Sequence, residues 1–429
     1  MSKEHFENKQ HTNGIIGPGV EMLGPIKDGG RITFTTAPGC WGPMITPTIR
    51  GGHEENIPVA VENAEEGDAI AIKIEKIKIL SKACSSGVDE PREGAYEGDP
   101  FVKKKCPECG TEYPEYEVKG IGQNAVVCKN CGAPVSPFKM INGYTMTLDP
   151  ENKIGVTVSK NKAEEIAEEA WDWHKLPENS EQVPILVFGQ ADIVGAGARI
   201  SPFLGQIGTT PAVDIPDSHN AGDFGTFLID APHQYAITKE EYSSKLTDGH
   251  LDINVTGEGT IVVAPVKVKG GGVYAGDAHA MQGDGEVAGH TTDITAESTV
   301  HCRVIKDLGN QGPILLPPVE YLPPLAKPWQ PDEWEKVKAL AEKMETEPEP
   351  TAPIQVVGSG ASINEAAEDG FKKAADLLGM SVAEVKNRVT FSGAVEIGRL
   401  PGIALVTLHA PMETLEELDL GELIREQYQ

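Results

Sequence analysis

The chain has 429 residues, enough for two or three domains and a large buried core. Its apolar content of 39%, with no apolar run long enough to cross a bilayer, indicates a soluble globular protein. The formal net charge of −28 would repel nucleic-acid phosphates and anionic membrane surfaces, so we expect neither nucleic acid nor a membrane as a partner. Residues 1–10 are polar and lack the apolar segment of a secretory signal, which predicts a cytoplasmic protein.

Residues 15–80 predict β structure, because apolar runs alternate with glycine and proline turn signals as in a sandwich or barrel. Isoleucines alternate from Ile70 to Ile74, and the alternation then slips by one residue, which predicts a β-bulge at Glu75-Lys76. The loop 37–43 is a candidate pocket wall that contains Trp41. His53 follows two glycines, a pattern more typical of a turn than of a ligand.

Four cysteines form two Cys-x-x-Cys pairs with 18 residues between them, and each pair is followed by glycine. This spacing predicts a structural tetrathiolate zinc site in a zinc ribbon over residues 102–137. The lysines at 103–105 would suit nucleic acid, but the acidic chain favours a structural role for the ribbon. The three other cysteines are scattered, which indicates a reducing compartment without a disulfide framework. The predicted zinc ligands are Cys106, Cys109, Cys128 and Cys131.

After the ribbon, the sequence predicts a helix over 163–171 and a buried strand over 185–188. Asp217 and His219 stand two residues apart in a stretch more typical of a solvated loop than of a site. Alternation over 248–255 predicts a strand that places His250, Asp252 and Asn254 on one face. That face is either solvent-exposed or one wall of a site.

The stretch 270–286 concentrates two aspartates, a histidine, a glutamate and six glycines directly after the strand-like run 260–268. Asp277 and His279 stand two residues apart, so on an extended segment both side chains project to one side and could meet one metal ion or one substrate atom. The glycines allow positive φ angles and let backbone N–H groups approach an oxyanion. Glu286 is a candidate proton carrier. Each Gly-Asp or Asp-Gly pair alone is typical of a turn, but the whole cluster favours a site.

The C-terminal region predicts α+β structure. An amphipathic helix over 334–344 precedes an acidic, proline-rich linker. Ser362 and Ser381 each stand three residues before a glutamate, which predicts two capped helices, the first ended by Gly379. A strand over 402–408 and a helical tail follow, and this region is expected to close over the β layer.

The run Gly276-Asp277-Ala278-His279-Ala280-Met281-Gln282-Gly283-Asp284-Gly285-Glu286 resembles the signature of the acetamidase/formamidase family. In that signature a Gly-Asp-x-His-x-x-x-Gly-Asp-Gly-Glu block follows a hydrophobic strand. Segments 53–68, 248–254 and 362–408 are similar to other family regions. The zinc ribbon is an insertion relative to the usual pattern. His250 and Asn56-Ile57 depart from the usual residues near the pocket, which leaves the substrate open.

The resemblance implies hydrolysis of a small linear amide, such as formamide or acetamide, to a carboxylate and ammonia on a mainly β scaffold, a β-sandwich with an α+β closure. Our hypothesis is that a divalent metal, Zn²⁺ or Ca²⁺, lowers the pKa of a bound water, while Glu286 transfers the proton and glycine N–H groups receive the oxyanion. The expected catalytic residues are Glu286, Asp277, His279 and Asp284. The expected ligands of the catalytic metal are Asp277, His279, His53 and Asp252. The expected substrate pocket contains His250, Gly283, Gly285 and Trp41.

Two other functions stay open at this stage. One is hydrolysis of a related C–N bond, in a carbamate or a cyclic amide. The other is a non-catalytic module that binds a small polar ligand while the ribbon docks on a partner. We expect a homo-oligomer, a dimer or larger. The expected organisation is a first part of the β-sandwich over 1–101, the ribbon over 102–137, the second part of the β-sandwich over 138–330 and the α+β portion over 331–429.

Overall fold

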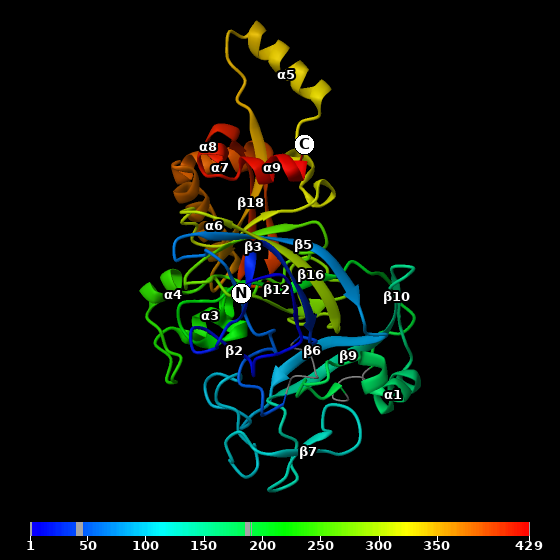
Figure 1. The fold of residues 1–429 in the computed structure, drawn as a ribbon. Helices are drawn as coiled ribbons and strands as arrows, with labels where there is room; N and C mark the ends of the chain where they lie inside the picture. Colours follow the sequence, from blue (N-terminus) through cyan, green and yellow to red (C-terminus); the bar gives the residue numbers. More distant parts are fainter. Residues whose placement is uncertain (1, 40–45, 185–188, 190, 429) are drawn as a thin grey trace.

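The computed structural model describes residues 2–39, 46–184, 189 and 191–428. Within these residues the chain is mainly β, with most long helices in the C-terminal portion (Figure 1), and the predicted fold class is confirmed. Trp41 and the predicted strand over 185–188 lie outside the described residues. In the described part of the chain, every helix is too short or too polar to span a bilayer.

A twelve-stranded mixed sheet forms the centre of the molecule. In spatial order its strands are β12 (Phe203–Thr209), β15 (Val273–His279), β4 (Val59–Val61), β3 (Leu23–Thr36), β16 (Ala296–Ile305), β5 (Ala69–Ile79), β14 (Ile261–Pro265), β17 (Ile314–Leu316), β18 (Thr351–Ser359), β20 (Ile403–Pro411) and β19 (Ala394–Arg399), and β1 (Lys3–Asn8) pairs with β3. The predicted β-bulge is confirmed, because Thr299 of β16 pairs with Lys76 and Val300 pairs with Ile74. Glu75 is therefore the extra residue of the bulged strand.

A second sheet of four antiparallel strands packs on the same core. Its strands in order are β11 (Gly197–Arg199), β10 (Ile154–Thr157), β9 (Phe138–Asp149) and β6 (Ala83–Pro91). Cys84 of β6 and Met146 of β9 belong to the apolar cluster that also contains Ile72 of β5 and Val300 of β16. Two sheets that share one core agree with the predicted sandwich.

Helices α6 (Ile363–Leu378) and α7 (Val382–Ser392) pack on the C-terminal strands β18 and β20. Both predicted N-caps are confirmed, since the side chain of Ser362 accepts the N–H of Glu365 and that of Ser381 accepts the N–H of Glu384. Gly379 ends α6 in the left-handed conformation, with a φ of 64°. The tail forms α8 (Met412–Glu417) and α9 (Gly421–Tyr428), so the C-terminal portion is α+β as predicted, and its strands extend the central sheet.

Three smaller features complete the fold. The helix predicted over 163–171 is two helices, α1 (Lys160–Glu168) and α2 (Ala170–His174), because Glu169 leaves the helical conformation with a φ of −113°. The hairpin of β7 (Tyr116–Val118) and β8 (Val126–Cys128) lies at one end of the molecule, and α5 (Pro331–Lys343) extends from the other end (Figure 1). Other short elements of the described residues are β2 (Ile15–Ile16), β13 (Ile215–Pro216), α3 (Gly222–Gly225), α4 (Lys239–Lys245) and the 3-10 turns η2 (Asp217–His219), η3 (Thr226–Leu228), η4 (Val319–Tyr321) and η5 (Pro324–Ala326).

Candidate active site

His53 lies in the segment of the chain that connects β3 to β4, and it is buried, with 2% of its surface exposed. Its backbone N–H donates to Asp217 Oδ1 at 2.9 Å, and its Nδ1 lies 3.1 Å from the same oxygen and 2.6 Å from Gln206 Nε2. Its Nε2 lies 3.3 Å from Asp277 Oδ2. Burial alone would lower the pKa of His53, but the carboxylates of Asp277 and Asp217 outweigh burial and raise the pKa well above 6.5. His53 is therefore held among carboxylates and is not an exposed turn residue.

Strand β15 brings Asp277 and His279 together, as the alternation predicts. His279 Nε2 lies 2.7 Å from Asp277 Oδ1 and 3.3 Å from Asp293 Oδ1, while the intervening Ala278 packs in the apolar core. Burial would lower the pKa of His279, but Asp277 and Asp293 outweigh burial and raise the pKa to about 9. This histidine carries a proton at neutral pH unless another cation takes the proton's place.

The strand predicted over 248–255 is wrong, because this segment is irregular. Asp248 and Asp252 have φ angles of 54° and 47°, which interrupt an extended chain, and the N–H groups of Leu251 and Asp252 both donate to the carbonyl of Gly205. Leu251 still packs in the core, and His250 and Asp252 still lie on the site side. The apolar and polar side chains of this segment therefore lie on opposite sides, as predicted, although the backbone is not a strand.

Arg399 at the end of β19 is a site residue that the sequence reasoning missed. Its Nη1 lies 2.5 Å from Asp252 Oδ2 and 2.9 Å from His250 Nε2, and only 2% of the residue is exposed. His250 Nε2 lies 2.8 Å from Asp252 Oδ2, and His250 Nδ1 donates to the carbonyl of Ser218 at 2.6 Å. The sequence feature that could have drawn attention to Arg399 is its position two residues after the Ser-Gly-Ala-Val-Glu-Ile run at 392–397.

Glu286 is buried beside this group, with 5% of its surface exposed. Its carboxylate lies within 4.8 Å of ligand atoms of Asp252 and His279. Burial and the charge of Asp252 raise the pKa of Glu286 well above 4.5, and Arg399 offsets only part of this effect. This direction favours the protonated form of Glu286, the form that a general acid uses.

Three other residues of the signature lie differently. Asp284 is exposed and accepts a hydrogen bond from Asn254 Nδ2, so its side chain points away from the buried cluster. Gly283 is also exposed. Gly285 is buried, and its N–H donates to the carbonyl of Gly398 at 3.2 Å, so this N–H is not available for the oxyanion role expected of it.

Glu55 is a second buried residue that the sequence reasoning missed. It is 0% exposed, and neither carboxylate oxygen has a hydrogen-bond partner among the described residues. Burial and the charge of Asp217 raise its pKa well above 4.5. Gly276 makes room for it, because a Cβ on Gly276 would lie 2.0 Å from Glu55 Oε2.

The backbone is strained at three of the clustered acids. Asp252, Asp277 and Glu286 have φ angles of 47°, 50° and 43°, in the left-handed region that residues other than glycine rarely adopt. Such conformations cost about 1–3 kcal/mol each and persist where the surrounding structure enforces them, as at functional sites. Their convergence on one cluster indicates a built site.

The cluster has the composition of a divalent-metal site. Three buried atoms, His53 Nε2, His279 Nδ1 and Asp252 Oδ1, have no hydrogen-bond partner within the described residues. Six buried acids face three histidines and one arginine, and this excess of negative charge is costly without protons or a cation. The acids are Glu55, Asp217, Asp252, Asp277, Glu286 and Asp293. Histidine nitrogens and carboxylates at these separations fit Zn²⁺ or a similar ion.

The four ribbon cysteines form a separate cluster. All four sulfur atoms lie within 4.8 Å of one another, and each knuckle closes with a glycine of positive φ, 70° at Gly110 and 80° at Gly132. The N–H groups of these glycines donate to the carbonyls of Cys106 and Cys128. The geometry fits the predicted zinc site, which would have no open coordination position.

The comparison with known proteins decides the family. A model of the acetamidase/formamidase family matches residues 40–417. The chain belongs to the acetamidase/formamidase family. The fold agrees with an acetamidase from Yersinia enterocolitica at a TM-score of 0.54 and 15% identity, covering 97% of this chain and 93% of that chain. It also agrees with a predicted acetamidase/formamidase from Thermoanaerobacter tengcongensis (TM-score 0.54, 15% identity, 98% and 99% covered) and with an acetamidase from Bacillus halodurans (TM-score 0.52, 15% identity, 96% and 99% covered).

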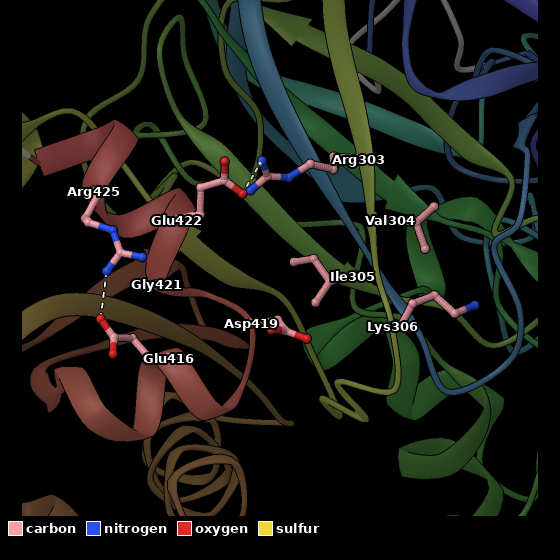
Figure 2. Close-up of a pocket in the computed structure, with 9 residues that line it drawn as sticks. All are labelled: Arg303, Val304, Ile305, Lys306, Glu416, Asp419, Gly421, Glu422 and Arg425. Atoms are coloured by element: carbon pink, nitrogen blue, oxygen red, sulfur yellow. Dashed lines mark hydrogen bonds and ion pairs between the residues drawn. The ribbon is translucent and has the colours of Figure 1, made fainter.

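In this member of the acetamidase/formamidase family, a surface pocket of about 560 Å³ lies elsewhere, between β16 and the C-terminal helices. Figure 2 shows two ion pairs among its lining residues, one from Arg303 of β16 to Glu422 and one from Arg425 to Glu416 within the C-terminal helices. None of the clustered histidines and acids lines it. The buried cluster contains Asp277, His279 and Glu286 of the run that resembles the family signature, and it is the candidate active site.

Proposed function

We propose that this protein hydrolyses a small linear amide, of the formamide or acetamide class, to a carboxylate and ammonia with the help of a divalent metal. Membership in the acetamidase/formamidase family supports an amide hydrolase. The observation that carries the proposal is the convergence of Glu286, His279 and Asp252, whose ligand atoms lie within 4.8 Å of one another in a buried, strained cluster. A small buried site suits a small substrate.

The side chains divide into those that hold a cation and those that move a proton. His53, Asp277, His279 and Asp252 would hold the metal, as the orphaned atoms on three of them suggest. A divalent cation supplies Lewis-acid chemistry, because it lowers the pKa of water and polarises a carbonyl group. Asp217 orients His53 through two contacts, and Arg399 fixes Asp252 and His250.

Glu286 is the proton carrier in this proposal. An amide nitrogen is a poor leaving group until it gains a proton, and burial and the charge of Asp252 raise the pKa of Glu286, which favours its role as a proton donor. In its ionised form the carboxylate can take a proton from the attacking water as the C–O bond forms, and can then deliver that proton to the nitrogen as the C–N bond breaks. The neighbouring positive charge of Arg399 stabilises that ionised form.

Ammonia release from a panel of substrates tests the proposal. The panel contains formamide, acetamide, propionamide, a carbamate and a cyclic amide, each with metal-loaded and chelator-treated protein. We expect turnover of the two smallest linear amides, loss on chelation and recovery when the metal is restored. Preference for the carbamate or the cyclic amide would replace the linear amide as the proposed substrate class. Binding of an amide without ammonia release would contradict the proposal.

We further propose that the chain forms a homo-oligomer through α5. This helix extends from the body (Figure 1), and Leu340 on it and Met344 at its C-cap are 58% and 60% exposed. An isolated helix of 13 residues is marginal in water, so its apolar face needs a partner. Three of its four acids lie in the first turns (332, 333 and 335) and the fourth is Glu342, whereas its lysines lie further along (336, 338 and 343), so two antiparallel copies would bring most of the opposite charges together about a twofold axis.

The molar mass of the protein in solution, measured by light scattering during size-exclusion chromatography, tests the oligomer proposal directly. We expect a dimer or larger for the natural chain and a monomer for the double variant Leu340→Glu, Met344→Glu. A monomeric natural chain, or an oligomer unaffected by the double variant, would contradict it.

We also propose a cytoplasmic location, supported by six described cysteines that are all free of disulfides.

A further inference from the structure

The 3-10 turn η2 connects three parts of the molecule with three successive residues. Asp217 accepts the N–H of His53 and lies 3.1 Å from its Nδ1. The carbonyl of Ser218 accepts the Nδ1 hydrogen of His250 at 2.6 Å. His219 faces away from both, toward the ribbon segment, which is defined here as residues 92–137. This turn therefore fixes two site histidines from one side.

Asp99 of the ribbon segment holds the third residue of the turn. It is 3% exposed, and its Oδ2 accepts the Nε2 hydrogen of His219 at 2.7 Å while its Oδ1 accepts the N–H of Phe101 at 2.9 Å. The ring of Phe101 packs edge-on against His219, with centroids 5.5 Å apart. His233 Nε2 lies 3.5 Å from the same carboxylate. A buried charge with this many partners fixes the turn strongly.

Lys104 provides a second connection from the ribbon segment. Its side chain is buried, although lysine is rarely so, and Nζ donates to the carbonyls of Thr46 and Ile49. Those carbonyls belong to the chain that leads into His53, whose N–H is held by Asp217. The ribbon segment thus contacts both the approach to His53 and the turn that orients it. Lys104 lies two residues before Cys106, a predicted zinc ligand, and its carbonyl accepts the N–H of Tyr113 at 3.0 Å, which connects Lys104 to the folded knuckle.

We propose that Asp99 and Lys104 are positioning residues for the active site, and that the zinc-loaded ribbon is required for turnover although it lies outside the reacting cluster. This inference rests on the proposed amide hydrolysis. Displacement of η2 by a fraction of an ångström would move Asp217 and Ser218 together and so misplace His53 and His250. Errors of about 1 Å in such groups can lower a rate by about 100-fold.

The variant Asp99→Asn keeps the shape of the side chain and removes the charge that holds His219. We expect kcat to fall about 10-fold to 100-fold with KM changed less than about threefold, at a temperature where all variants are folded. Lys104→Met should act in the same direction, and Lys104→Arg, which keeps N–H donors, should recover part of the loss. The matched control is Glu115→Gln in the same segment, an exposed partner of Lys129 that should leave kcat unchanged.

A double variant tests whether the metal site of the ribbon and Asp99 act on the active site through the same turn. Cys131→Ser should also lower kcat, and the double variant with Asp99→Asn should be no slower than the slower single variant, because both act on the same turn. A ribbon that only stabilises the fold would lower the melting temperature in these variants and leave kcat unchanged, and that result would overturn the inference.

A readout independent of turnover separates this inference from the proposed function. The ring-nitrogen NMR shifts of His53 and His250, assigned with His53→Gln and His250→Gln, should change in Asp99→Asn and stay unchanged in Glu115→Gln. If the natural chain hydrolyses no amide and these shifts still move, the proposed function fails and the positioning role stands. If amides are hydrolysed but neither the shifts nor kcat respond to Asp99→Asn, the positioning role is refuted.

Discussion

Asp217 holds His53 at two points, by accepting its backbone N–H at 2.9 Å and by lying 3.1 Å from its Nδ1. A carboxylate behind a ligating histidine fixes the ring orientation, and loss of such a partner typically costs 10-fold to 100-fold in metal affinity or activity. We expect Asp217→Asn to lower metal affinity or kcat by about that factor. Isothermal titration and steady-state kinetics measure both. Asp214→Asn is the control, because Asp214 is exposed and accepts only the N–H of Gly19 in the hydrogen bonds described.

Glycine at 276 is required by Glu55. A methyl group there would lie 2.0 Å from Glu55 Oε2 and 2.4 Å from Cδ, so Gly276→Ala must displace a buried carboxyl group. Overpacking of this kind costs about 1–3 kcal/mol in the free energy of unfolding, and we also expect turnover to be lost. Gly283→Ala is the matched control in the same motif, because a Cβ there meets open space. Equal denaturant midpoints for the two variants would refute the close contact.

Metal binding should strengthen as the pH rises. In the metal-free protein the pKa of His279 is about 9, so below that pH a cation must displace a proton. The logarithm of the apparent affinity should therefore increase by up to about one for each pH unit below pH 9 through His279 alone, and by up to about two where His53, whose pKa is also raised, must lose a proton as well. Titrations with Zn²⁺ or Co²⁺ in non-chelating buffers measure this slope. A slope that is flat over this range, or unchanged in His279→Gln, would remove His279 from the ligand set.

The ribbon cysteines should account for one zinc ion for each chain. Cys128→Ser removes a buried thiolate from the cluster, and three remaining sulfurs bind zinc less well. We expect the variant to lose one equivalent of zinc in elemental analysis and to exchange the amide hydrogens of β7 and β8 faster, because metal binding drives folding of such small units. Full zinc content in this variant would contradict the assignment.

Local patterns predicted much of this structure. Alternation located the bulge at Glu75 and the shared side of Asp277 and His279, and serine followed by glutamate located the starts of α6 and α7. Each of these features depends on residues only a few positions apart. Short-range periodicity and capping chemistry are sufficient for them.

The rest of the site depends on contacts between distant residues. Arg399 meets Asp252 across 147 positions, and its place after the run 392–397 does not by itself indicate that contact. The segment containing Asp217 and His219 resembles a solvated loop in composition, and that interpretation is wrong because both residues are 0% exposed. The strand predicted over 248–255 fails for a related reason, since the positive φ at Asp252 serves the site and not the local propensity.

The central claim is that the buried cluster around Glu286 hydrolyses amides, and the variant Glu286→Gln tests it most directly. The amide keeps the size of the side chain and loses the exchangeable acid proton, so metal content should stay as in the natural chain. With metal content measured in the same samples, ammonia release from formamide and acetamide should fall by a factor of about 100 or more, within the range known for a lost general acid–base group. Full activity in metal-loaded Glu286→Gln would contradict the account.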